Sequence, residues 1–164
     1  MSVTINGGAV MRAWYDVAGD GRQDEAGIRA SQARVEAIIG REMSRGIRAA
    51  SIVLAGFSQG GAVALQTGLR RPERLAGILA LSTYLPLADK LATEASPANR
   101  AIPILMCHGT QDPVIPLSAA TRSRDALRAL GYAVDWKEYP MPHAVCAEEI
   151  ADIGGWLRRV LQPS

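Results

Sequence analysis

The motif G-x-S-x-G at residues 56–60 lies where an apolar run changes into a helix-like pattern. Before it, residues 51–55 (SIVLA) have the composition of a strand buried on both faces of a parallel sheet. After it, residues 61–69 (GAVALQTGL) predict a helix. A serine on a sharp strand-to-helix turn exposes its hydroxyl above the sheet, so the motif predicts a nucleophile elbow and acyl transfer through Ser58. The alternative is a tight turn in which Ser58 only caps the helix.

The rest of the chain alternates between strand patterns and helix patterns. The expected strands are 75–81, 102–107 and 132–139, with a short extended piece at 3–5. The expected helices are 24–45, 118–130 and 150–161. Residues 82–100 are expected to form a variable connection. This order predicts a single α/β domain over residues 1–164, with a mostly parallel sheet flanked by helices. In such sheets ligands bind at the carboxyl ends of the strands.

Composition excludes several classes of protein. The net charge is only +2, from 18 basic and 16 acidic residues, and the arginines are scattered, so no nucleic-acid partner is expected. No apolar run approaches the roughly 20 residues of a membrane span, and no leader pattern opens the chain. Cys107 and Cys146 are too few for a disulfide framework, so a cytoplasmic setting is expected. Cys146 begins the last helix and is expected to be a buried small side chain rather than a nucleophile.

A serine nucleophile needs a base and an acid that orients the base. Of the two histidines, His143 lies in a loop after the fourth strand and is the better candidate base, whereas His108 follows the third strand and is expected to be structural. Asp112 lies in the loop just past the third strand and precedes His143. The order Ser58, Asp112, His143 is that of α/β-hydrolases. The alternative for Asp112 is a turn aspartate before a proline.

Several longer segments also carry a family resemblance: VTINGG (3–8), RAWYD (12–16), LAGFSQGGA (54–62), LALST (79–83), HGTQDPVIP (108–116) and YPMPHAVCAEEI (139–150). They closely resemble bacterial members of the phospholipase/carboxylesterase family, the relatives of acyl-protein thioesterases. The resemblance implies an α/β-hydrolase fold and a serine esterase that uses no metal or cofactor. The implied substrates are small to medium acyl esters or thioesters.

The same resemblance assigns roles residue by residue. Ser58 resembles the nucleophile, Asp112 the acid and His143 the base, and the backbone N–H of Gln59 resembles one oxyanion donor, since it follows the nucleophile.

Apolar residues expected near the site are Trp14, Val114 and Leu85, which are predicted to contact the substrate. Trp14 lies in a glycine-flanked loop, Val114 follows Asp112, and Leu85 follows the second strand. The alternatives are that Trp14 anchors its loop to the core, that Val114 packs in the core, and that the loop at Leu85 forms an association surface.

The segment before Ser58 departs from the family pattern. It contains no apolar strand leading into the HG-type loop that supplies the second oxyanion donor in this fold. We therefore expect an N-terminally incomplete domain, in which residues 6–8 (NGG) are an alternative source of that donor. Losing one donor costs about 10²- to 10³-fold in turnover, so the site is expected to react but slowly. The alternative function is a catalytically weakened hydrolase-like remnant or an interaction module.

The strand before Ser58 carries a second expectation. Its apolar residues predict neighbouring strands on both sides, and a missing neighbour would leave an unpaired edge. We expect the chain either to form a homodimer through this sheet edge or to fold poorly alone.

Overall fold

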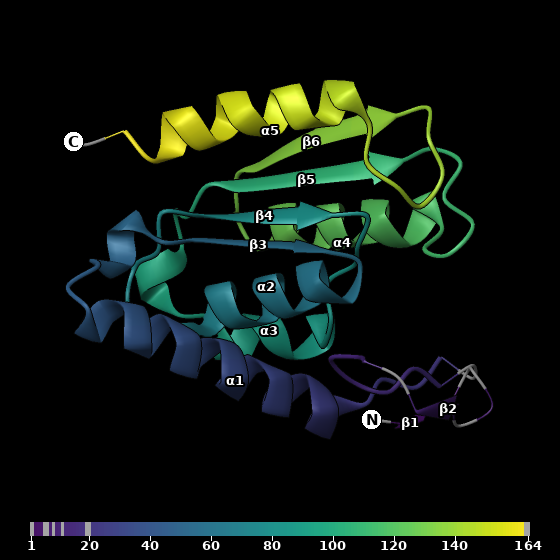
Figure 1. The fold of residues 1–164 in the computed structure, drawn as a ribbon, viewed down its shortest axis with the longest axis horizontal. Helices are drawn as coiled ribbons and strands as arrows, with labels where there is room; N and C mark the ends of the chain where they lie inside the picture. The colour runs from purple at the N-terminus through teal and green to yellow at the C-terminus, as the bar shows by residue number, and fades with distance from the viewer. Residues whose placement is uncertain (1, 5–6, 8, 11, 19–20, 163–164) are drawn as a thin grey trace.

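A parallel sheet forms the centre of the computed structural model, which describes residues 2–4, 7, 9–10, 12–18 and 21–162. Its four strands are β3 (Val53–Phe57), β4 (Gly77–Leu81), β5 (Ile104–Gly109) and β6 (Val134–Tyr139), in the order β3-β4-β5-β6 (Figure 1). All neighbouring strands run parallel. Their carboxyl ends therefore meet at one edge, where ligand chemistry is expected.

Helices cover both faces of this sheet. α2 (Gln59–Arg70), α3 (Ala88–Glu94) and α4 (Leu117–Ala129) lie on one face, and α5 (Ala147–Val160) lies on the other (Figure 1). α1 (Glu25–Ser44) packs against α2. Its N-cap is Asp24, whose carboxylate accepts a hydrogen bond from the Gly27 N–H at 2.9 Å. The result is an α/β domain with a parallel sheet flanked by helices, as the sequence predicted.

Two apolar cores result from the alternation of side chains along the strands. The core under α2, α3 and α4 includes Leu54, Leu65, Leu69, Ile78, Leu91, Ile104, Met106 and Leu127. The core under α5 includes Leu79, Leu105, Cys107, Tyr139, Met141 and Trp156. Successive residues of β4 and β5 thus enter opposite cores, which explains why these strands read as continuous apolar runs.

A small antiparallel pair precedes α1. β1 (Ser2–Val3) pairs with β2 (Ala9–Val10), in the region where an extended piece at 3–5 was predicted. Residue 5 of that prediction lies outside the described residues, as do residues 6 and 8 of the NGG tract. The Asp16 carboxylate accepts a hydrogen bond from the Thr4 N–H at 2.6 Å, which links this pair to the loop that follows.

The connection at 82–100 is more ordered than predicted, because it contains α3 and a short 3-10 helix at Pro97–Asn99. α3 has only seven residues, too few for a helical period to show in the sequence, and Leu91 is its only fully buried residue. The third strand is also longer than predicted at its carboxyl end, so His108 lies within β5 rather than after it. Among the described residues, none of the helices combines the length and apolar character needed to cross a membrane.

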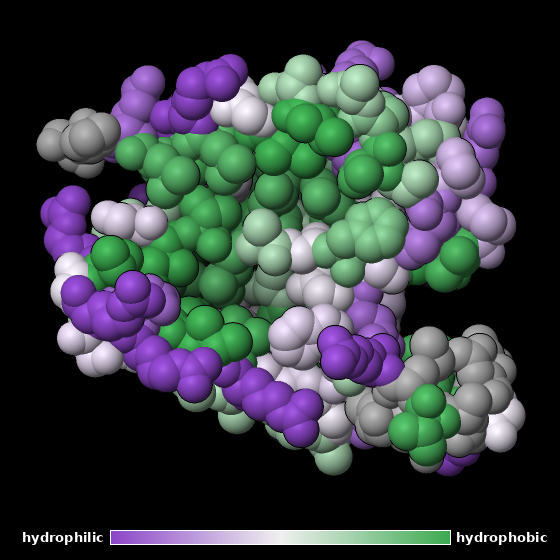
Figure 2. Space-filling view, viewed as in Figure 1, coloured by the Kyte–Doolittle hydropathy of each residue, from purple (hydrophilic) through white to green (hydrophobic). Residues whose placement is uncertain are grey.

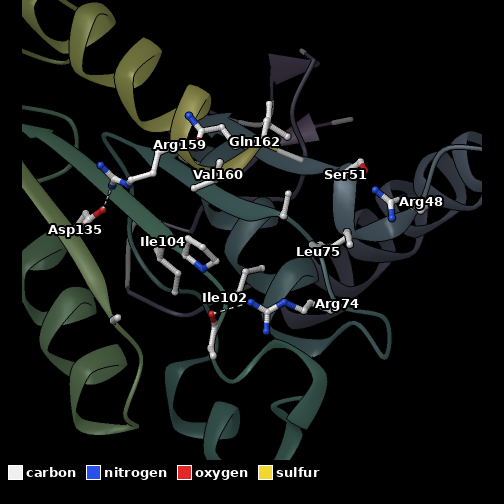
Figure 3. A pocket seen from close by; sticks show the side chains of 16 residues that line it. Arg48, Ser51, Arg74, Leu75, Ile102, Ile104, Asp135, Arg159, Val160 and Gln162 are labelled. Atoms are coloured by element: carbon white, nitrogen blue, oxygen red, sulfur yellow. Dashed lines mark hydrogen bonds and ion pairs between the residues drawn. The ribbon is translucent and has the colours of Figure 1, made fainter. Parts of the chain in front are cut away.

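A cavity of about 630 Å³ lies at the amino ends of the strands (Figure 3). Arg48, Ser51 and Arg74 line it, together with Arg159, which forms an ion pair with Asp135 at 2.7 Å. This cavity is at the opposite end of the sheet from Ser58, which follows the carboxyl end of β3. It is therefore separate from the candidate active site.

Candidate active site

Ser58 occupies a strained turn between β3 and α2. Its φ of 55° and ψ of −124° are rarely adopted by L residues, and such strain concentrates at functional sites. The Ser58 N–H donates to the Leu81 carbonyl at 2.8 Å, which fixes the turn to the end of β4. Within the described part of the chain, the Ser58 side chain makes no capping hydrogen bond to α2. The hydroxyl therefore does not cap the helix, in contrast to the capping alternative.

Close packing around the turn explains its small residues. A Cβ on Gly56 would lie 2.2 Å from the Gly60 carbonyl carbon, and one on Gly61 would lie 2.8 Å from Thr83 Cγ2. Thr83 Oγ1 also donates to the Ser58 carbonyl at 2.7 Å. Thr83 is a positioning residue that the sequence analysis missed, although its place just after β4 is a usable signal.

The structure brings Asp112 and His143 together from two different loops. His143 Nδ1 lies 2.7 Å from Asp112 Oδ2, and the second carboxylate oxygen accepts the N–H groups of Val114 at 2.8 Å and Ile115 at 2.9 Å. Burial alone would raise the pKa of Asp112, but the hydrogen bonds from His143, Ile115 and Val114 outweigh it and lower that pKa. Asp112 is therefore held as a carboxylate that orients the imidazole.

His143 lies against the end of the elbow strand. Its ring centroid is 4.6 Å from that of Phe57, the residue before Ser58. Ser58, Asp112 and His143, which are far apart in sequence, thus gather at the carboxyl edge of the sheet, where the sequence analysis placed them.

The second histidine has a different environment. His108 is buried, and its Nε2 donates to the Ile115 carbonyl at 2.9 Å. The same nitrogen is 3.6 Å from Asp112 Oδ2, and the ring stacks on Trp136 with 6.4 Å between centroids. These contacts stabilise the loop that carries Asp112 and fit the structural role predicted for His108.

The Gln59 side chain ties the loop at residues 12–16 to the elbow. Its Oε1 accepts the Trp14 N–H at 3.1 Å, and its Nε2 donates to the Tyr15 carbonyl at 3.1 Å. Ser31 Oγ also donates to the Trp14 carbonyl. The sequence indicates a role only for the backbone N–H of Gln59; this side-chain role is not visible in it, because the contact joins segments more than forty residues apart.

The three predicted substrate contacts have different environments. Trp14 is 38% exposed and lines a shallow hollow with Gln59, so it is available to a ligand. Val114 is 62% exposed beside Asp112. Leu85, in contrast, is buried in the core under α2, α3 and α4, and its N–H donates to Ser123 Oγ at 2.9 Å. The prediction that Leu85 lines the pocket is wrong for this structure, because the loop turns that side chain inward.

Neither cysteine is placed as a nucleophile. Burial raises the pKa of Cys107 to about 12, so its thiol stays protonated. Cys146 is half-buried at the start of α5, where its Sγ accepts the Glu149 N–H at 3.5 Å. Among the described residues, no group of three or more His, Cys, Asp or Glu side chains is arranged to hold a metal ion.

Replacing Gln59 with alanine is expected to loosen the loop at 12–16 while the backbone N–H at position 59 remains. Each lost hydrogen bond is worth about 1 kcal/mol, so KM should rise about three- to tenfold with a smaller change in kcat. Steady-state kinetics on an acyl ester measure this, and Gln162→Ala, an exposed glutamine near the end of α5, is the control. An unchanged KM would contradict the role given to this side chain.

The sheet is parallel and carries a serine elbow, and an aspartate and a histidine meet at its carboxyl edge. These features define a hydrolase of the α/β-hydrolase class. The chain belongs to the phospholipase/carboxylesterase family, whose sequence model matches residues 1–161.

Similar proteins include fungal acyl-protein thioesterases. Acyl-protein thioesterase 1 of Neurospora crassa is 44% identical over 167 residues, which cover 94% of this chain and 68% of that protein. The Gibberella zeae protein of the same name is 38% identical over 172 residues, covering 98% of this chain and 73% of that protein. These relatives support a hydrolase and do not support the weakened-remnant alternative. The N-terminally incomplete domain stays a prediction.

Solved structures of plant proteins are also similar. Arabidopsis thaliana SOBER1 has a TM-score of 0.92 at 31% identity, covering 98% of this chain and 80% of that chain. Zea mays acyl-protein thioesterase 2 has a TM-score of 0.83 at 32% identity, and the match covers 98% of this chain and 78% of that chain. Since these relatives are fungal and plant proteins, the similarity does not single out bacterial members of the family.

Proposed function

We propose that the protein hydrolyses acyl thioesters and esters of small to medium chain length through an acyl-enzyme formed on Ser58. The observation that carries this proposal is the 2.7 Å contact between His143 Nδ1 and Asp112 Oδ2 beside the strained Ser58 turn. The similarity to acyl-protein thioesterases supports the choice of thioesters among the substrates.

The tautomer of His143 follows from its partner. Asp112 is a carboxylate and can only accept, so His143 Nδ1 carries a proton and Nε2 has a free lone pair. Nε2 takes the Ser58 proton as Oγ attacks the acyl carbon, and then gives it to the leaving thiol or alcohol. A water molecule, activated by the same nitrogen, releases the acid and regenerates Ser58.

Negative charge develops on the acyl oxygen during both steps. The Gln59 N–H, the first of α2, lies at the positive end of the helix dipole and is the proposed donor to that oxygen. Trp14 and Val114, which remain exposed beside the site, are the proposed apolar contacts for the acyl chain. A cytoplasmic location is part of the proposal and is supported by the two free cysteines.

The proposal is tested by two measurements on the same purified protein. A fluorophosphonate probe should label it covalently, and a series of thioesters and oxygen esters of increasing acyl length should show turnover that falls for long chains. Folded protein that neither reacts with the probe nor releases thiol from any member of the series would overturn the proposal. Turnover of oxygen esters alone would remove thioesters from it.

A further inference from the structure

Glu149 carries a buried carboxyl group that the proposed mechanism does not use. It lies in the first turn of α5 and is 0% exposed, whereas its neighbour Glu148 is exposed. In Figure 2 the hydrophilic residues lie mainly around the outer margin of the molecule, where solvent hydrates them. Both carboxyl oxygens of Glu149 are instead enclosed, and among the described residues neither has a hydrogen-bond partner of ordinary geometry.

An enclosed carboxyl group without a full partner lowers the stability of a fold. Its transfer out of water is unfavourable unless hydrogen bonds or an ion pair compensate. Burial accordingly raises the pKa of Glu149, and the backbone N–H of Cys146 lowers that pKa by less. An apolar side chain of similar volume would fit such an environment at least as well. Stability alone therefore does not account for a glutamate at this position.

The position of Glu149 connects it to the loop that carries His143. Cys146 is the N-cap of α5, three residues after His143 and three residues before Glu149. A glutamate at the third position of a helix reaches back toward the N–H of the N-cap residue, in the arrangement called a capping box. The reciprocal contact is present, since the Glu149 N–H donates to Cys146 Sγ at 3.5 Å. The Glu149 carboxyl therefore faces the end of the loop at 140–146.

The two ends of the loop at 140–146 are held in different ways. Its start is fixed by backbone hydrogen bonds from the loop after β5: the Thr110 N–H donates to the Tyr139 carbonyl at 2.8 Å and the Gln111 N–H to the Met141 carbonyl at 3.1 Å. The part that follows His143 is held through Cys146, whose Sγ and N–H both face Glu149. The position of His143 thus depends on both ends, and Glu149 acts on the second.

We propose that Glu149 is a positioning residue for His143, and that it acts by fixing the Cys146 end of the loop. The inference rests on the proposed function, because His143 is the base of that reaction. A displacement of a catalytic group by about 1 Å costs about 10²-fold in rate. Functional sites often keep groups that reduce stability, because activity depends on them. The buried carboxyl is such a group: it destabilises the fold and keeps the imidazole within 2.7 Å of Asp112.

Three variants separate this role from a purely structural one. Glu149→Leu keeps a similar volume without a polar atom, and Glu149→Gln keeps an uncharged group whose oxygen can face the Cys146 N–H. Glu149→Leu should lower kcat about 10- to 100-fold with KM within about twofold, while the urea midpoint stays at or above the wild-type value. Glu149→Gln should recover most of kcat. Glu148→Leu, on the exposed neighbour, is the matched control and should change neither kcat nor KM.

The ¹H NMR resonance of the proton between His143 Nδ1 and Asp112 Oδ2 is a readout that needs no turnover. It should be present in the wild type and in Glu149→Gln, and broadened or lost in Glu149→Leu. Glu149→Leu with wild-type kcat and resonance overturns the proposal, as does Glu149→Gln that is as slow as Glu149→Leu. A Glu149→Leu protein that does not fold also overturns it, because the carboxyl would then stabilise the fold. If the wild type hydrolyses no ester, the proposed function fails, and the resonance alone decides the role of Glu149.

Discussion

Ser58→Ala is expected to abolish hydrolysis and fluorophosphonate labelling, with a fall in kcat of about 10⁴- to 10⁶-fold. The hydroxyl is the atom that attacks the substrate, and the described part of the chain provides no replacement nucleophile at the turn, since Cys107 is buried and has a raised pKa. Alanine keeps the Cβ of serine, so the strain of the φ of 55° is unchanged and the fold should persist.

Mass spectrometry of labelled protein checks this result directly. The matched control is Ser118→Ala, which removes an exposed hydroxyl in the first turn of α4 and should keep both labelling and turnover. Persistent labelling of Ser58→Ala would show that the probe reacts at another residue and would remove Ser58 from the mechanism.

The second large effect is expected for Asp112→Asn, with kcat falling about 10⁴-fold at neutral pH. An asparagine amide can donate to His143 Nδ1, which would then lose its proton to the other ring nitrogen. The Nε2 atom that must accept the Ser58 proton would already be protonated. The geometry would change little, since the 2.7 Å contact and the N–H groups of Val114 and Ile115 still have partners.

Steady-state kinetics with a common acyl ester measure this loss. Asp125→Asn makes the same change of charge on α4, where Asp125 is exposed and pairs with Arg124, and should leave kcat unchanged. A loss in Asp112→Asn smaller than tenfold would contradict the proposed orientation of His143.

The same aspartate makes stability depend on pH. The pKa of Asp112 is lowered in the folded protein. The contribution of its carboxylate to the free energy of unfolding is therefore fully present above the unfolded-state pKa of about 3.9, and it is lost as the pH falls through the lower pKa of the folded state. The stability difference between wild type and Asp112→Asn should therefore shrink in acid. Urea unfolding of both proteins at neutral pH and below pH ~4 measures whether this stability difference becomes smaller in acid.

Local patterns predicted most of the fold because each long element has a clear period. α1 was expected at 24–45 and is found at Glu25–Ser44, and α4 was expected at 118–130 and is found at Leu117–Ala129. α3 was missed because seven residues show no reliable period. Leu85 was misplaced because an apolar residue in a loop does not reveal whether its side chain points inward or outward.

The sequence by itself determined the strand–serine–helix turn, the parallel order of the sheet and the candidates Ser58, Asp112 and His143, since these depend on local periodicity and on residue types at strand ends. Only the tertiary structure decided which contacts join distant segments. Examples are the Asp112–His143 hydrogen bond and the Gln59 side chain that holds the loop of Trp14. Local sequence encodes the path of each element, but the direction of a side chain and the neighbours of a strand depend on how the whole chain packs.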